Sequence, residues 1–176
     1  GGMLSCSDAG KGLVTVDMGA ARLDWQQIPL AQAVDTNDFA LELPDGPIAA
    51  SAVSVGNPHC VLFVPDAGAA PVAQLGPRIE TLPLFPGRTN VEFAQVLDRE
   101  NIRMRVWERG VGITQACGTG ACAVVVAAAR RGLTGRKVDV ALDGGVLSIE
   151  WRQDGHVLMS GPTAAPFRGY VDLNGL

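Results

Sequence analysis

The segment Ala116-Cys117-Gly118-Thr119-Gly120-Ala121 places a thiol where a glycine-rich loop enters an apolar helix. First-turn N–H groups have no partner within a helix, and the helix dipole makes this end partly positive. Gly118 and Gly120 leave the backbone open and Thr119 can cap, so the junction suits a carboxylate or a phosphate. The same field favours a thiolate, and we expect a lowered pKa for Cys117. Cys117 is then a nucleophile or a general base, with a buried structural cysteine as the alternative.

The helix after this junction is apolar without a break from Ala121 to Ala129, and Arg130-Arg131-Gly132 follows it. Basic residues and then a glycine are typical of a helix C-terminus. A helix without a polar face is buried on all sides. Nine apolar residues cannot span a bilayer, which needs about 20. We therefore predict a core helix with Cys117 at its N-terminus and no association with a membrane.

Three other segments carry side chains that could bind a ligand or move a proton. Gly56-Asn57-Pro58-His59 lies between two predicted strands, where proline restricts the backbone, although, taken alone, a histidine at such a place is more often structural. Asn90 is a loop amide that, taken alone, indicates only a structural role. Glu108-Arg109 ends a strand that leads into the cysteine loop. A surface ion pair is one interpretation of it, and an arginine that binds a carboxylate through two parallel hydrogen bonds is the other.

Short strand patterns separated by turn residues account for most of the remaining chain. The one other helix is predicted over residues 71–82, where Pro71 can open it and Pro77, inside it, is unfavourable. With the core helix, these patterns indicate an α+β fold in which a mixed, mostly antiparallel sheet curls around a central buried helix. The predicted strands cover residues 13–18, 22–28, 39–43, 48–55, 60–64, 91–97, 102–108, 137–142, 146–151, 156–160 and 169–173.

Composition excludes several classes of function. The 176 residues are 47% hydrophobic and suit one globular domain or a little more, and a net charge of −4 argues against a nucleic-acid partner. Residues 1–6 carry no secretion signal, so we expect a cytoplasmic protein with free thiols. Cys117 and Cys122 lack the spacing of a zinc site. Both lysines lie beside turns, which argues against a Schiff-base cofactor, and the glycine loop lacks the ending of a nucleotide-binding P-loop.

Taken together, the motifs of this chain resemble the diaminopimelate epimerase family, and the resemblance spans nearly the whole sequence. Each motif alone is unspecific, but their order and spacing match. They are Val16-Asp17-Met18-Gly19, Gly56-Asn57-Pro58-His59, Gln74-Leu75-Gly76-Pro77, Arg88-Thr89-Asn90-Val91, Glu108-Arg109-Gly110-Val111-Gly112 and Ala116-Cys117-Gly118-Thr119-Gly120-Ala121.

The resemblance implies two similar lobes, each a set of strands around a central helix. It implies an isomerase that interconverts LL- and meso-diaminopimelate, a precursor of lysine and peptidoglycan, with no cofactor and no metal. One cysteine thiolate would remove the α-proton and a thiol on the opposite face would return one, and Cys117 is one of these two. His59 and Glu108 would assist the acid–base chemistry. The substrate would be held by Asn57, Asn90, Glu108, Arg109, Gly118 and Thr119.

Two departures from the family pattern stand out. Ile113 takes a position that is commonly acidic, so one contact in that loop could differ. The first lobe's own cysteine, in a Cys-Gly-Asn-Gly-like loop, has no counterpart, and Cys6 does not match it. We therefore expect the C-terminal part of a longer protein: residues 1–18 as strands of the first lobe, 19–161 as the second lobe, and 162–176 as a crossing segment whose last strand returns to the first lobe.

On this interpretation the missing lobe is a partner, the complete enzyme is a homodimer, and the chain alone is inactive. Two alternatives stay open. One is a racemase or isomerase of the same fold that acts on another small acid, although Glu108-Arg109-Gly110 favours the epimerase. The other is a single-lobe protein that binds an anion without catalysis.

Overall fold

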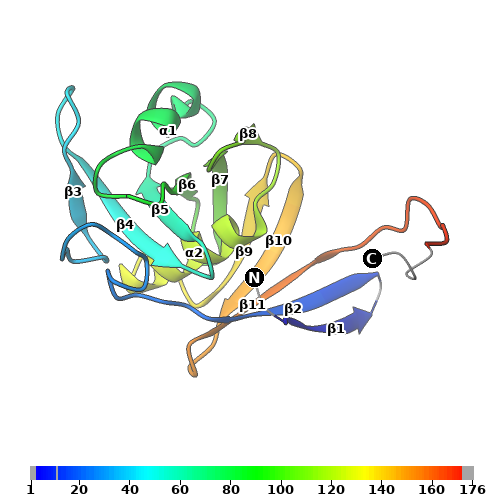
Figure 1. Cartoon of the computed structure of the whole chain (residues 1–176). Coiled ribbons are helices and arrows are strands. Elements are labelled where there is room, and N and C mark those ends of the chain that lie inside the picture. The colour runs from blue at the N-terminus through cyan, green and yellow to red at the C-terminus, as the bar shows by residue number, and fades with distance from the viewer. Residues whose placement is uncertain (1–2, 11, 172–176) are drawn as a thin grey trace.

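The computed structural model describes residues 3–10 and 12–171, which form one 11-stranded sheet and two helices (Figure 1). Along the sheet the order is β1-β2-β11-β10-β9-β7-β6-β5-β4-β3, and β8 pairs with β7. Of the pairs in the described residues, β5–β6 and β7–β9 are parallel and the others antiparallel, so the predicted mixed sheet is confirmed. The elements are β1 (Ser5–Gly10), β2 (Leu13–Ala20), β3 (Phe39–Leu41), β4 (Ile48–Ser54), β5 (Pro58–Phe63), α1 (Val72–Glu80), β6 (Asn90–Val96), β7 (Asn101–Glu108), β8 (Gly112–Thr114), α2 (Gly118–Arg130), β9 (Lys137–Leu142), β10 (Gly145–Trp151) and β11 (His156–Pro162).

Helix α2 fills the inside of the curved sheet, as its apolar sequence predicts (Figure 1). Every residue from Gly120 to Ala128 is buried. Their alanine and valine side chains are small, so strands can approach the helix from several sides. The inner faces of these strands contribute Val53, Val61, Ala94, Met104, Val106, Val140, Ile149 and Val157.

The C-terminus of α2 also follows the prediction. Gly132 adopts the left-handed backbone (φ 70°), its N–H donates to the Ala129 carbonyl, and the Leu133 N–H donates to the Ala128 carbonyl at 3.0 Å. These bonds satisfy carbonyls that the helix leaves unpaired. The helix is therefore closed at this end, and its N-terminus is the end that can meet a ligand.

The outer face of β4, β5 and β6 carries a second core, which α1 covers. Alternate residues point to opposite faces of a strand. Thus Val91 and Phe93 belong to the outer core, whereas Ala94 belongs to the core around α2. Gly76 in the middle of α1 lies directly against the Trp107 side chain of β7.

Strands β1, β2 and β11 form a ribbon that projects from the body of the molecule (Figure 1). All of β1 is exposed. The predicted domain limits at residues 18/19 and 161/162 lie inside β2 and β11, and the assignment of the ribbon to another lobe stays a prediction.

One predicted strand is wrong, another is irregular where it is described and lies partly outside the described residues, and β8 was missed. Over residues 22–28 only Arg22 pairs, with Ser54, because the Asp24 carboxylate then accepts the Gln26 N–H at 2.8 Å and turns the chain. Residues 169–171 are irregular, and 172–173 lie outside the described residues. The three-residue β8 was too short for a pattern. Within the described part of the chain, neither helix is long and apolar enough to cross a membrane.

Replacing Gly76 by alanine tests the contact between α1 and β7. A Cβ atom at this position would stand 2.5 Å from Trp107 Cγ and 2.6 Å from its Cβ, atoms near the backbone that cannot swing away. We expect Gly76→Ala to lower the free energy of unfolding by about 1–3 kcal/mol, despite the better helix propensity of alanine. Urea unfolding followed by circular dichroism measures the change.

Gly87→Ala is the matched control, because an added methyl there meets nothing within 4 Å. Its urea midpoint should match that of the parent chain. Equal midpoints for Gly76→Ala and Gly87→Ala would contradict the tight contact at Trp107.

Candidate functional site

Cys117 occupies the N-cap of α2, where the sequence placed it. Its backbone is extended (φ −140°, ψ 104°), and its carbonyl accepts the Ala121 N–H at 3.0 Å to begin the helix. The residue is 8% exposed, and its Sγ lies 3.5 Å from Thr119 Oγ1. Gly118 packs against Met159 of β11, because a Cβ atom here would stand 2.8 Å from the Met159 sulfur.

The lowered pKa predicted for Cys117 is wrong for this structure. Burial, followed by the negative charge of Glu92, raises the pKa of the thiol to about 11. The hydrogen bonds from Thr119 and from the Gly120 N–H favour the thiolate, as the helix argument expects, but they are the smaller effects. The thiol is therefore protonated at neutral pH.

His59 lies at the centre of a polar network that reaches Cys117. The ring is fully buried, with Nδ1 2.6 Å from Glu92 Oε1 and Nε2 3.0 Å from Asn57 Oδ1. Asn57 Nδ2 donates to Thr119 Oγ1 at 3.3 Å, and Thr119 contacts the thiol. The structure thus brings together four of the residues singled out in the sequence: Asn57, His59, Cys117 and Thr119.

Glu92 is the member of this network that the sequence analysis missed. It is fully buried in β6, and burial raises the pKa of its carboxyl against the opposing charge of His59. The only signal in the sequence was an acidic residue inside the apolar run Val91-Glu92-Phe93-Ala94. Such residues are rarely buried unless they are paired.

Asn90, Glu108 and Arg109 form a second group, around the turn after β7. Asn90 Nδ2 donates to the Pro58 carbonyl at 3.1 Å, and its Oδ1 accepts the Arg109 N–H at 2.9 Å. The Arg109 guanidinium is exposed and donates to the Gly87 carbonyl at 3.0 Å. The Glu108 carboxylate accepts a short hydrogen bond from the Thr114 hydroxyl. Ile113 is half-exposed on β8, next to this group.

Glu80 at the end of α1 supports this turn from behind. Its carboxylate accepts the Trp107 Nε1–H at 2.6 Å and the Gly110 N–H at 3.0 Å, and Arg88 lies 3.5 Å away. Burial alone would raise the pKa of Glu80, but these partners outweigh it and the pKa is lowered. One buried carboxylate therefore joins α1 to the turn that carries Arg109 and to the loop that leads into Asn90.

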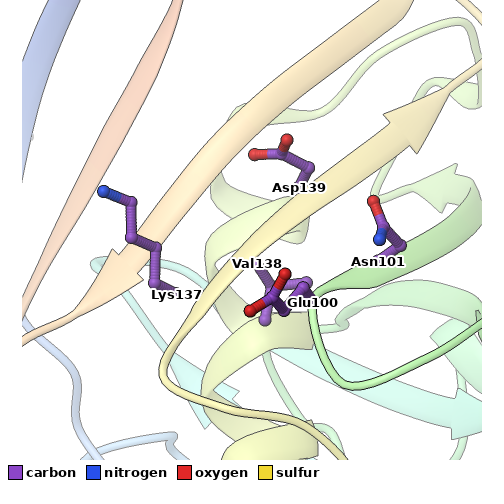
Figure 2. A pocket seen from close by; sticks show the side chains of 5 residues that line it. All are labelled: Glu100, Asn101, Lys137, Val138 and Asp139. Atoms are coloured by element: carbon purple, nitrogen blue, oxygen red, sulfur yellow. The ribbon is translucent and has the colours of Figure 1, made fainter.

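A cavity of 560 Å³ opens beside the Cys117 network, between that network and the ribbon. Its lining residues are Leu4, Met18, Arg22, Val55, Gly56, Asn57 and Thr119. The amide and the hydroxyl that connect His59 with Cys117 therefore both face open space. A second hollow, of 270 Å³, lies between β9 and the start of β7 (Figure 2). It is lined by Glu100, Asn101, Lys137, Val138 and Asp139, and it contains no thiol or imidazole.

Comparison with known proteins identifies relatives along nearly the whole chain. The family described as diaminopimelate epimerase matches residues 51–165. The diaminopimelate epimerase of Rhodospirillum centenum is 60% identical over 171 residues, which are 96% of this chain and 57% of that protein. That of Erythrobacter litoralis is 54% identical and covers 98% of this chain and 63% of its own length. The chain thus spans about three fifths of the length of these curated relatives.

Solved structures share the fold at low sequence identity. A probable proline racemase from Agrobacterium radiobacter K84, with bound carbonate, has a TM-score of 0.63 at 17% identity and covers 97% of this chain and 56% of its own. A predicted epimerase from Pseudomonas aeruginosa has a TM-score of 0.57 at 21% identity and covers 90% and 58%. At these identities the likeness concerns the fold alone.

The role of Glu80 can be tested by Glu80→Gln. The amide has one oxygen where the carboxylate has two, so either the Trp107 or the Gly110 donor loses its acceptor. We expect a loss of about 1–3 kcal/mol in the free energy of unfolding at pH 7. Because the folded pKa lies below the ordinary 4.5, this contribution is present above pH 4.5 and lost as the pH falls through the folded pKa. Urea titrations at pH 7 and below pH 4.5 measure both effects.

Asp45→Asn is the control, because it removes the charge of an exposed carboxylate that also contacts α1. Asp45 pairs with Arg78 of that helix at 2.8 Å. This control should change stability by less than about 1 kcal/mol at pH 7. A Glu80→Gln effect that stays constant with pH would contradict the assigned role of the charge.

Proposed function

The chain belongs to the diaminopimelate epimerase family, and from this premise we propose that it supplies one half of an active site that interconverts LL- and meso-diaminopimelate without a cofactor. The observation that carries the proposal is the position of Cys117. Its thiol stands at the N-terminus of α2, and Thr119 connects it to the cavity. The reaction belongs to the synthesis of lysine and peptidoglycan precursors, and we place the enzyme in the cytoplasm.

The α-carboxylate of the substrate binds at the first turn of α2. The N–H groups of Gly118 and Thr119 have no partner within the helix, and the positive end of the dipole favours an anion there. Asn57 and Thr119 line the cavity and hold the substrate next to the thiol. When the α-proton leaves, negative charge develops toward this carboxylate, and the same N–H groups stabilise it. This is how the site replaces an electron-withdrawing cofactor.

Cys117 enters the reaction as the proton donor. Because burial and the charge of Glu92 raise its pKa to about 11, the thiol carries its proton at neutral pH. A thiolate on the opposite face of the substrate removes the α-hydrogen as a proton, and the electron pair stays on the α-carbon. The Sγ–H bond of Cys117 then breaks, and its proton forms the new C–H bond from the other side. The configuration is inverted, and Cys117 is left as the thiolate.

The reverse direction exchanges the two roles, with Cys117 as the base. His59 and Glu108 assist by setting the charge around the thiol. His59 reaches Cys117 through Asn57 and Thr119, and the charge of Glu108 acts directly on the pKa of the thiol.

The turn after β7 binds the far end of the substrate. Diaminopimelate carries a second ammonium and a second carboxylate, and a guanidinium binds a carboxylate through two parallel hydrogen bonds. Arg109 is exposed and donates to the Gly87 carbonyl, the Glu108 carboxylate stands at the end of β7, and the Asn90 amide at the start of β6 accepts the Arg109 N–H. Ile113 stands beside them without a charge, so this chain relies on Arg109 and Glu108 for the contact.

The second thiol comes from a first lobe outside this chain. Cys60 and Cys122 are fully buried, and Cys6 lies on exposed β1; none of them lines the cavity. The chain alone is therefore inactive. We propose that the ribbon of β1, β2 and β11 joins this lobe, and that the complete enzyme is a homodimer.

Exchange of the substrate α-proton tests the proposal. LL-diaminopimelate in D₂O is incubated with this chain, with the part of the Rhodospirillum centenum relative that this chain does not cover, and with both together. We expect loss of the α-proton NMR signal, with inverted product, only in the mixture. Exchange by this chain alone would contradict the split site. A mixture in which the two parts associate but no exchange occurs would favour one of the alternatives, an enzyme of the same fold that acts on another small acid or a module that only binds an anion.

Substitution of the thiol completes the test. Cys117→Ser in the mixture should reduce epimerisation by at least about 1,000-fold, because serine does not ionise in this pH range and cannot exchange roles. Cys6→Ser, on exposed β1, should leave the rate unchanged. Activity retained by Cys117→Ser would refute the assignment.

A further inference from the structure

Glu92 enters the mechanism derived above only through its charge, yet its environment is costly. The side chain is fully buried, and Oε2 has no hydrogen-bond partner among the described residues. A buried carboxylate oxygen without a partner destabilises the folded state. A glutamate is therefore a poor choice for this position on grounds of stability alone.

The position places the carboxylate against the active-site end of α2. Val91 and Phe93 face the outer core, so Glu92 points to the inner face, toward the helix. A Cβ atom built on Gly120 would stand 2.9 Å from Glu92 Oε1 and 3.3 Å from Cys117 Sγ. The carboxylate and the thiol thus flank one backbone position, and only glycine leaves room for both.

The hydrogen bonds that connect His59 with Cys117 all donate in the same direction, from the His59 ring toward the thiol. Thr119 Oγ1 accepts from Asn57 Nδ2, which leaves the Thr119 proton for the Cys117 sulfur. With Nδ2 used in this way, Asn57 presents Oδ1 to His59 Nε2, so Nε2 carries a proton and donates. The Glu92 carboxylate accepts from the other ring nitrogen, Nδ1, at 2.6 Å, so both ring nitrogens carry protons and His59 is an imidazolium paired with Glu92. The carboxylate therefore sets the orientation of a chain of donors that ends at the thiol.

We propose that Glu92 is a positioning residue for proton transfer at Cys117: its carboxylate holds His59 as an imidazolium whose Nε2–H donates to Asn57, and it places a negative charge across Gly120 from the thiol. The inference rests on the proposed function, because proton transfer by Cys117 is what gives the arrangement its purpose. Glu92 is then a second carboxylate, besides Glu108, that controls the protonation of the Cys117 thiol.

The balance of charge around Cys117 supports this role. Negative charge comes from Glu92 on β6 and, more weakly, from Glu108 on β7, and both raise the pKa of the thiol. The other titratable or charged groups that face the site are His59 on β5, Cys122 on α2 and Arg22 in the cavity wall. Of the two carboxylates, Glu92 has the larger effect on the thiol.

Alkylation of Cys117 tests the charge without any substrate. The rate of modification by iodoacetamide is followed from pH 7 to 10 by peptide mass spectrometry, in a Cys6→Ser background that removes the exposed thiol. Glu92→Gln keeps an oxygen for His59 but removes the charge, and we expect the Cys117 pKa to fall by about one unit or more. The rate at pH 8 should then rise about threefold or more, since a less basic thiolate is also less nucleophilic. Glu150→Gln, a half-exposed carboxylate on β10 that pairs with Lys137, should leave the rate unchanged.

A measurement on the unsubstituted chain tests the geometry, and it stands even if Glu92→Gln fails to fold. The ¹⁵N NMR shifts of the His59 ring at pH 7 should show protons on both Nδ1 and Nε2. A ring nitrogen without a proton, or equal alkylation rates for folded Glu92→Gln and its parent, would overturn the proposal. Neither assay contains diaminopimelate, so a failure of this inference is distinguished from a failure of the proposed function, which would show as an absence of epimerase activity in the mixture of the two lobes.

Discussion

The absence of a polar face on α2 is the constraint from which the rest of the structure follows. A helix made of alanine and valine must be covered on every side, and the sheet curls around it to do so. Its C-terminus is closed by the bonds at Gly132 and Leu133. Only the N-terminus is left with unpaired N–H groups beside a cavity, and Cys117 stands there. The position of the thiol is thus a consequence of the burial of the helix.

Two buried carboxylates interrupt the apolar cores, and they differ in how they are satisfied. Glu80 lies behind Trp107 and Gly110 and accepts a hydrogen bond from each, so it ties α1 to the turn that carries Arg109. Glu92 lies on the face toward α2 and keeps one oxygen unpaired. A satisfied buried charge holds a turn in place, whereas an unsatisfied one is retained against stability. The hydrogen bonds of Glu80 therefore account for its presence as a structural residue, whereas the presence of Glu92 is accounted for by a role in proton transfer.

Much of this arrangement was predictable from the sequence, because the signals are local. The apolar run of α2, its cap at Gly132 and the alternation in β7 each lie within one segment, and all were predicted correctly. The wrong strand at residues 22–28 arose because the Asp24 turn outweighs the alternating pattern. Glu92 was missed because its meaning depends on β5 lying parallel to β6, which brings His59 beside it. Such a pairing between distant segments has no local signature.

The pKa of Cys117 is a second property that depends on contacts between distant segments, and it changes the role expected for the thiol. A helix N-terminus favours an anion, and from the sequence the thiolate is the obvious candidate. In the folded chain, burial and Glu92 oppose that charge, and the thiol keeps its proton. On the proposed function, the anion that the helix stabilises is then the substrate carboxylate rather than a standing thiolate. On that proposal, the chain meets its substrate as a proton donor, and the thiolate that begins the reaction in that direction comes from the opposite side of the site.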